Sequence, residues 1–184
     1  MSKVLLLLAP GFEEIEALGT CDVLRRLNVE VVMAALNGRE VAGAHGIRVA
    51  ADAELKDLDT GAFDAVVLPG GMPGAVNLLA VKDLVRDFAD RGKITAAICA
   101  APIVLSAAGV LEGRAFTMYP GFGKYLNPGE EPTGRLVESD GPVVTGKGPG
   151  ATFFFAAAVA RALGVEPRAT GDVLGSMFAS SAAE

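Results

Sequence analysis

The strongest constraint on the fold is a repeated alternation of short apolar runs with segments of helical period. Strands that alternate with helices form a parallel sheet with helices on both faces. Helical spacing places Ile15, Leu18, Cys21 and Leu24 on one face, and a long helix is expected from Phe153 to Leu163. We therefore predict an α/β fold with a mainly parallel sheet, in one domain over residues 1–184. Five runs have the continuous hydrophobicity of strands buried on both faces: VLLLLA (4–9), VEVVMAAL (29–36), AVVLP (65–69), ITAAIC (94–99) and PVVTG (142–146).

Two segments depart from the alternation. Residues 39–50 contain Gly43 and Gly46 and predict a small antiparallel hairpin, whereas residues 127–142 predict turns around a short peripheral strand. In sheets of this kind, ligands collect beyond the carboxyl ends of the strands. We therefore expect one site where four motifs follow strands: PGFEEIE (10–16), PGGMPG (69–74), CAAP (99–102) and GKGPG (146–150).

The charge of the chain argues against nucleic acids and anionic membranes as partners. Sixteen basic residues face 22 acidic ones, giving a net charge of -6, and the longest basic cluster is Arg25-Arg26. No segment approaches the roughly 20 apolar residues of a membrane span. Cys21 and Cys99 fall in separate predicted elements, which indicates free thiols and predicts a cytoplasmic location. Small neutral or electrophilic ligands fit this composition.

Cys99 stands at the predicted junction between strand 94–99 and a helix that begins near Pro102. Such a turn exposes the nucleophile of many α/β enzymes. The positive end of the helix dipole favours an anion, so the position predicts a lowered thiol pKa and a nucleophilic, oxidisable sulfur. The alternative is a small core side chain, a common role of free cysteines. Cys21, which shares a helix face with Leu18 and Leu24, is interpreted as structural.

Three glutamates crowd the start of the first predicted helix: Glu13, Glu14 and Glu16. Carboxylates there complement the helix dipole. A carboxyl buried beside a thiolate would instead have a raised pKa and could donate its proton to the sulfur. The spacing leaves open which of the three does so. Gly70 and Gly71 predict either a concavity of backbone N–H groups that stabilises an anion or a simple tight turn.

Motifs for nucleotides and metals are incomplete. Residues 141–147, GPVVTGK, resemble the start of a P-loop, but Gly148 stands where Ser or Thr would bind magnesium. GKGPGA (146–151) lies too late in the chain for a dinucleotide fingerprint, and we interpret it as a helix entry with Pro149. One histidine and two cysteines provide no zinc spacing, and His45 is interpreted as a loop residue. We expect no metal and no cofactor.

Taken together, four motifs resemble in order and spacing those of the ThiJ/PfpI superfamily, on the branch of the Parkinson-disease-linked protein deglycases and their bacterial homologues. They are APGFEEIEA, VVLPGG, AAICAAP and GKGPGA, and the similarity runs from about Lys3 to Leu163. The resemblance implies a flavodoxin-like sandwich that forms a homodimer. It also implies an easily oxidised cysteine in a small pocket at the subunit boundary.

Matched position by position, Cys99 corresponds to the reactive cysteine of this family and Glu16 to the protonated glutamate that contacts it. Further residues are assigned to the oxyanion pocket: Gly71 and Ala100 as backbone donors, with Gly70, Tyr119 and Pro149 beside them. The resemblance further implies that the loop containing His45 approaches the partner subunit, which predicts that His45 borders the partner's pocket.

The resemblance implies several activities: glyoxalase activity without glutathione, repair of glycated proteins and nucleotides, oxidative-stress sensing and chaperone function. We predict a cysteine-dependent glyoxalase or deglycase that acts on small 2-oxoaldehydes such as methylglyoxal. The alternative is a redox-responsive stress protein or chaperone in which Cys99 becomes a sulfinate. An amidase or peptidase is less favoured, because Tyr119 stands where many relatives carry a histidine. Tyr119 is predicted either to offer its hydroxyl to a bound carbonyl or to fill the pocket wall.

Overall fold

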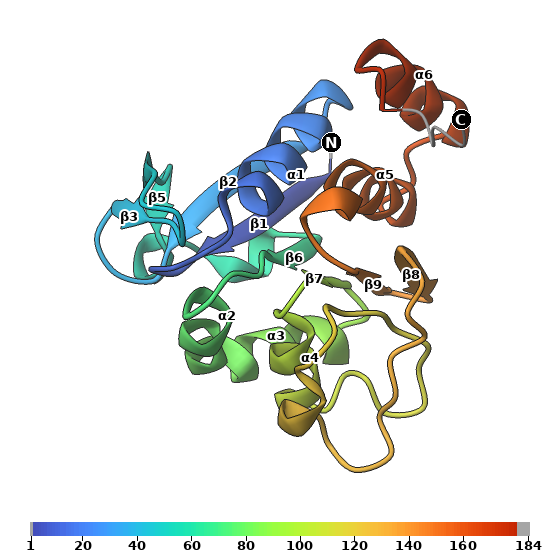
Figure 1. Ribbon diagram of the computed structural model, residues 1–184. Coiled ribbons are helices and arrows are strands. Elements are labelled where there is room, and N and C mark those ends of the chain that lie inside the picture. Colours follow the sequence, from blue (N-terminus) through green and yellow to red (C-terminus); the bar gives the residue numbers. More distant parts are fainter. Residues whose placement is uncertain (1, 180–184) are drawn as a thin grey trace.

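Seven strands form one sheet in the order β5-β2-β1-β6-β7-β9-β8 (Figure 1). Neighbouring strands are parallel except β8 and β9, which are antiparallel. The computed structural model describes residues 2–179, so Met1 and residues 180–184 of the predicted domain lie outside the described part. The strands are β1 (Lys3–Leu8), β2 (Glu30–Ala35), β5 (Ala53–Glu54), β6 (Ala65–Leu68), β7 (Ile94–Ile98), β8 (Val137–Asp140) and β9 (Val143–Gly146).

Helices cover both faces of this sheet. Figure 1 shows α1, α5 and α6 on one side and α2, α3 and α4 on the other. The prediction of a mainly parallel α/β sandwich is thereby confirmed. The helices are α1 (Glu14–Arg26), α2 (Gly74–Asn77), α3 (Lys82–Asp90), α4 (Pro102–Ala107), α5 (Thr152–Ala162) and α6 (Pro167–Ser176). Short 3-10 turns span Leu55–Asp57, Thr60–Ala62, Leu78–Val81, Gly123–Tyr125 and Pro149–Ala151.

The predicted hairpin is present as β3 (Glu40–Ala42) and β4 (Arg48–Ala50), which pair antiparallel. Two backbone hydrogen bonds attach it to the loop that follows β1. The Gly11 amide donates to the Ala42 carbonyl over 2.8 Å, and the Ala44 amide donates to the Phe12 carbonyl over 2.8 Å. The hairpin therefore lies beside the start of α1, where the three glutamates are.

The core is aliphatic, and the middle of the sheet is its centre. Every residue from Val4 to Leu8 is fully buried, as the continuous apolar run predicts for a strand covered on both faces. One residue of an expected helix face is wrong: Ile15 is 56% exposed, because Glu14 and Glu16 turn inward at the start of α1, whereas Cys21 and Leu24 are buried as expected. Within residues 2–179, none of the helices has the length and apolar character needed to cross a membrane.

Candidate active site

Cys99 occupies a sharp turn between β7 and α4. Its φ of 63° lies in the left-handed region, which costs a residue other than glycine on the order of 1–2 kcal/mol. Two backbone hydrogen bonds hold this turn: the Cys99 amide donates to the Gly146 carbonyl over 2.9 Å, and the Cys99 carbonyl accepts from the Tyr119 amide over 2.8 Å. The strand ends at Ile98, so Cys99 follows it at the carboxyl edge of the sheet.

Glu16 is the glutamate that the structure brings to Cys99. Its side chain is fully buried, and Oε2 accepts a hydrogen bond from the Gly70 amide over 2.8 Å. Oε1 is also buried and has no hydrogen-bond partner within residues 2–179. Burial raises the pKa of Glu16 to about 7, against the lowering effect of the hydrogen bonds with the Gly70 amide and Cys99. This carboxyl can therefore take up or release a proton near neutral pH.

Glu13 positions Glu16 for this role. It caps α1, and its Oε2 accepts from the Glu16 amide over 2.7 Å. In a capping box the glutamate three positions later would bond back to the amide of the cap residue. Here the Glu13 amide donates instead to the Gly70 carbonyl over 2.9 Å. The Glu16 carboxyl is consequently free to face Gly70 and Cys99.

The predicted effect of the helix start on Cys99 needs a correction. Burial raises the pKa of the Cys99 thiol to about 12, with further increases from the charge of Glu16 and its hydrogen bond, while the Gly71 and Ala100 amides lower it. The dipole contributes little because α4 has only six residues and begins at Pro102. Two of the three raising effects require an ionised Glu16, so the two groups titrate as a pair. A proton on Glu16 removes both effects.

Gly70 and Gly71 allow the backbone to approach this pair closely. A Cβ on Gly70 would lie 2.6 Å from the Cys99 Cβ and 2.8 Å from Glu16 Oε2. Gly71 has a φ of 89°, and a Cβ there would lie 2.4 Å from the Glu13 amide nitrogen. Only glycine fits at both positions. The LPGG segment therefore forms a wall against Cys99 and Glu16 as well as a turn.

Glu14 interacts with His45. Its side chain is only 4% exposed, and its oxygens accept from the His45 amide and contact His45 Nδ1, each over 2.7 Å. The hydrogen bond and the charge of Glu14 raise the pKa of His45. Potential ligand atoms of Glu13, Glu14 and His45 lie within 4.8 Å of one another. Because the Glu14 oxygens already contact the amide and the ring of His45, this group carries no metal assignment.

Tyr119 lies next to Cys99 in a shallower position, and Pro149 lines the same surface as Tyr119. The Tyr119 amide donates a hydrogen bond to the Cys99 carbonyl, but Tyr119 is 47% exposed, and its ring contacts Phe122 edge-on at 6.3 Å between centroids. Both residues line an apolar surface cavity of about 240 Å³, together with Leu136 and Lys147. This position favours the interpretation of Tyr119 as part of a wall. A contact between its hydroxyl and a substrate stays a prediction.

The raised pKa of Glu16 predicts a specific loss of stability at high pH. The folded protein keeps this proton up to about pH 7, whereas the ordinary value is 4.5. The stabilising contribution is therefore fully present below about pH 4.5 and is lost as the pH rises through 7, amounting to about 3 kcal/mol. Urea unfolding of the wild type and Glu16→Gln should show their difference in unfolding free energy falling by this amount between pH 4 and 8. Parallel pH curves would mean that Glu16 is already ionised in the folded protein.

Sequence reasoning identified Cys99, Glu16, Gly70, Gly71 and Ala100, and the structure brings these five together. It missed the positioning role of Glu13, which was grouped with its neighbours. The available signal was the spacing of Glu13 and Glu16, which is that of a helix cap and the third helical position. His45 has no hydrogen bond to Cys99 within residues 2–179, and its predicted place at a partner's pocket stays a prediction.

Known proteins resemble this chain in sequence. Protein dj-1beta of Drosophila melanogaster is 40% identical over 170 residues, covering 89% of this chain and 90% of that protein. A glutathione-independent glyoxalase of Caenorhabditis elegans is 34% identical over 165 residues, covering 88% of each chain. A deglycase of Pyrococcus abyssi is 34% identical over 151 residues, covering 80% of this chain and 91% of that protein.

A solved structure also has a fold similar to that of this chain. The crystal structure of a DJ-1 superfamily protein from Salmonella typhimurium superimposes with a TM-score of 0.88 at 38% identity, covering 97% of this chain and 98% of that one. The sequence also matches the DJ-1/PfpI family over residues 2–162. Together with the sheet order and the residues around Cys99, this match over nearly the whole sequence shows that the chain belongs to the DJ-1/PfpI family.

Proposed function

We propose that this protein is a cysteine-dependent enzyme of the glyoxalase or deglycase type that acts on small 2-oxoaldehydes without glutathione, metal or cofactor. The observation that carries the proposal is the buried pair of Cys99 and Glu16, with the pKa of Glu16 raised to about 7. A carboxyl with such a pKa can act as acid and as base near neutral pH. The relatives named as a glyoxalase and a deglycase support the same reaction class.

The first step is nucleophilic addition. Cys99 and Glu16 together lose one proton. In the reactive form, the Cys99 sulfur carries the negative charge and Glu16 keeps its proton. The thiolate adds to the aldehyde carbon of methylglyoxal, and the aldehyde oxygen becomes an alkoxide that takes a proton to give a hemithioacetal. Amides of Gly71 and Ala100, which already lower the pKa of Cys99, are the donors available to the developing oxyanion.

The second step is an internal transfer of hydrogen. Glu16, ionised after giving up its proton, removes the hydrogen from the former aldehyde carbon as a proton and returns it to the neighbouring carbon, while the hydroxyl proton of the former aldehyde passes to the ketone oxygen. The hemithioacetal thus becomes a 2-hydroxy thioester, with no external oxidant. Water then cleaves the thioester and restores Cys99. The overall change is methylglyoxal plus water to lactate plus a proton.

The direct test is the formation of lactate from methylglyoxal by the purified protein, without glutathione and in the presence of a metal chelator. We expect multiple turnovers per Cys99. A stoichiometric adduct on Cys99 with no release of lactate would contradict an enzymatic role. Deglycation is tested in parallel by following release of the amine from a methylglyoxal adduct of N-acetyl-lysine, with free methylglyoxal trapped so that simple removal of the aldehyde is not counted.

A second candidate is a redox-responsive stress protein or chaperone in which Cys99 is oxidised to a sulfinate. The same two amides, from Gly71 and Ala100, could donate to sulfinate oxygens, and Glu16 could donate its proton. Mass spectrometry after mild peroxide, run beside the lactate assay, separates the candidates. Oxidation that abolishes turnover favours the enzyme, whereas oxidation of a protein without turnover favours the redox role.

The surface beside the site supports a homodimer as part of this proposal. Ile15 and Ile47 are 56% and 54% exposed, and with Pro149 they line a cavity of about 400 Å³ next to Glu13 and Glu14. Apolar side chains around a concave surface are typical of an interface. We further place the protein in the cytoplasm, because Cys21 and Cys99 are both free.

Introducing a charge into this apolar surface should break the dimer. Ile47→Glu is expected to shift the sedimentation coefficient from that of a dimer to that of a monomer, because an unpaired negative charge would be buried at the interface beside Glu13 and Glu14. Phe178→Glu is the matched control, since Phe178 is 92% exposed and follows α6, which lies away from the β3 hairpin (Figure 1). A wild type that sediments as a monomer at micromolar concentration would contradict the dimer.

A further inference from the structure

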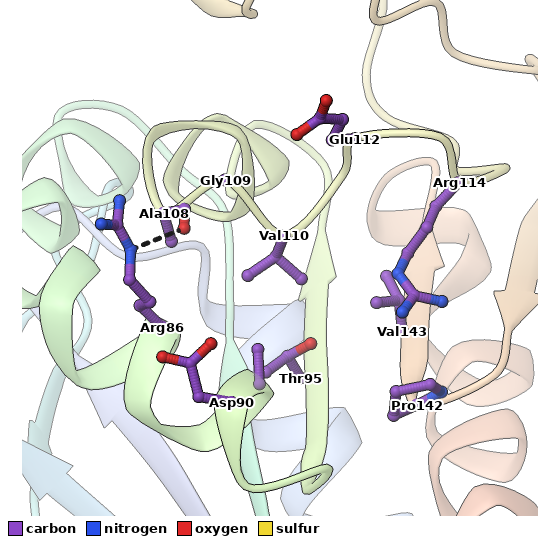
Figure 2. Close-up of a pocket in the computed structure, with 11 residues that line it drawn as sticks. Arg86, Asp90, Thr95, Ala108, Gly109, Val110, Glu112, Arg114, Pro142 and Val143 are labelled. Atoms are coloured by element: carbon purple, nitrogen blue, oxygen red, sulfur yellow. Dashed lines mark hydrogen bonds between the residues drawn. The ribbon is translucent and has the colours of Figure 1, made fainter.

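A second concave site lies at the end of the sheet opposite Cys99. A cavity of about 310 Å³ lies between the last turn of α3, the segment after α4, and the starts of β7 and β9 (Figure 2). Thr95 lies near the start of β7, whereas Cys99 follows its other end. The cavity therefore shares a strand with the proposed active site but none of its residues. The proposed function assigns it no role.

Thr95 contributes a polar group that the fold leaves unused. The residue is fully buried, and its Oγ1 has no hydrogen-bond partner within residues 2–179. Its amide donates to the Pro142 carbonyl over 2.9 Å, which holds it beside the cavity. Buried hydroxyls are normally hydrogen-bonded, because an unpaired one costs free energy. The Thr95 hydroxyl is therefore a hydrogen-bond donor that no residue in the described part of the chain uses.

One side of the cavity favours a cation. Asp90 is the last residue of α3 and has no ion pair or hydrogen bond within the described part of the chain. Its neighbour Arg91 pairs with Asp87 instead. A carboxylate at a helix C-terminus faces the negative end of the helix dipole, so the two negative groups reinforce each other. An ammonium group beside Asp90 would be attracted both to its carboxylate and to the C-terminal end of α3.

The other side of the cavity favours an anion. Arg114 Nη1 donates to the Asp140 carbonyl over 3.3 Å and lies 3.7 Å from its carboxylate. These contacts orient the guanidinium, while Nε and Nη2 make no hydrogen bond within residues 2–179. Figure 2 shows Arg114 across the cavity from Asp90, with Thr95 and Val110 between them. A guanidinium with free N–H groups is well suited to a carboxylate.

We propose that this cavity binds a small amphoteric molecule of the α-amino acid class, with its ammonium group at Asp90 and its carboxylate at Arg114 and Thr95. Val110, Pro142 and Val143 provide an apolar wall for a short aliphatic side chain. The volume is at the lower end of the range for small-molecule sites, which suits a ligand of this size. A simple anion fits less well, because Asp90 and Glu112 balance the charges of Arg86 and Arg114 around the cavity.

The test uses L-valine and two analogues that each lack one charge. Isovalerate lacks the ammonium group, and isobutylamine lacks the carboxylate. In a titration followed by ¹⁵N NMR, L-valine is expected to shift the amides of Thr95, Gly109 and Val110 with saturation, and each analogue should bind at least about tenfold more weakly. Equal binding of either analogue, or the absence of saturable shifts with L-valine, would overturn the assignment.

Two variants separate ligand contact from effects on folding. Thr95→Val keeps the shape but removes the hydroxyl, so affinity should fall about tenfold while the melting temperature stays equal or rises. Thr20→Val is the matched control, because Thr20 also has a buried hydroxyl without a hydrogen-bond partner among residues 2–179 and lies outside the cavity. Unchanged affinity in Thr95→Val, or an equal loss in Thr20→Val, would contradict the proposal. These measurements do not involve Cys99, so their outcome is independent of the proposed function.

Discussion

Replacing Cys99 with alanine is expected to lower the rate of lactate formation from methylglyoxal by more than about 10³-fold. The sulfur forms the covalent bond of the first step, and no other residue of the described site offers a nucleophile in its place. The oxyanion donors from Gly71 and Ala100 remain in the variant, so binding of the aldehyde changes little. The loss should therefore be in kcat. It is measured as initial rates over a range of methylglyoxal concentrations.

The matched control is Cys21→Ala. Cys21 is also buried and free, and it lies on α1 with no part in the proposed chemistry. Its variant should keep the wild-type kcat even if it melts at a lower temperature, because it loses only packing. Comparable activity of Cys99→Ala and the wild type would remove the enzymatic proposal. Loss of activity in both variants would show that general destabilisation, and not the Cys99 sulfur, explains the effect.

Replacing Glu16 with glutamine is expected to lower kcat by about 10²-fold, the usual size of a general acid–base contribution. The amide has nearly the shape of the carboxyl but cannot take up and return a proton. Covalent addition of the aldehyde to Cys99 should persist, so a hemithioacetal adduct should accumulate in the variant. Intact-protein mass spectrometry after borohydride reduction detects that adduct.

Glu138→Gln provides the control for the loss of a buried carboxyl. Glu138 is 8% exposed on β8, and one of its oxygens has no hydrogen-bond partner within residues 2–179, as in Glu16. The two variants each remove a buried carboxyl, but only the Glu16 carboxyl lies beside Cys99. Equal losses of kcat in both would show that burial of a carboxyl, and not its place beside Cys99, matters for activity.

Much of the fold could be predicted from the sequence because the strands are continuously apolar. The residues from Val4 to Leu8 are all apolar, so neither face of this strand has side chains suited to water. Its burial on both sides therefore follows from its composition. The start of α1 could not be predicted in the same way. Periodicity placed Ile15 inward, but Glu14 and Glu16 are held inward by hydrogen bonds to loops far along the chain. A local sequence pattern cannot predict hydrogen bonds between residues that are so far apart in the chain.

The residues of the candidate site could be predicted from the sequence, but the direction of the Cys99 pKa could not. Motifs and resemblance identified Cys99 and Glu16, since both stand at ends of predicted elements. The direction of the Cys99 pKa depended on the length of α4 and on how deeply Glu16 is buried, and neither is encoded in a short motif. A helix of only six residues has a weak dipole, so the neighbouring carboxyl determines the charge on the sulfur.

In the reactive form that we propose, Glu16 holds the proton while Cys99 carries the negative charge. The rate of Cys99 alkylation by iodoacetamide as a function of pH, in the wild type and in Glu16→Gln, tests it most directly. We expect the pair to lose its one proton with an apparent pKa of about 7 in the wild type, and thiolate to form only at a higher pH in the variant, because the buried thiol then has no carboxyl with which to share the proton. A wild-type pKa at or above that of a free thiol, about 8.5, that falls in Glu16→Gln would show that Glu16 is the ionised partner and would contradict the account.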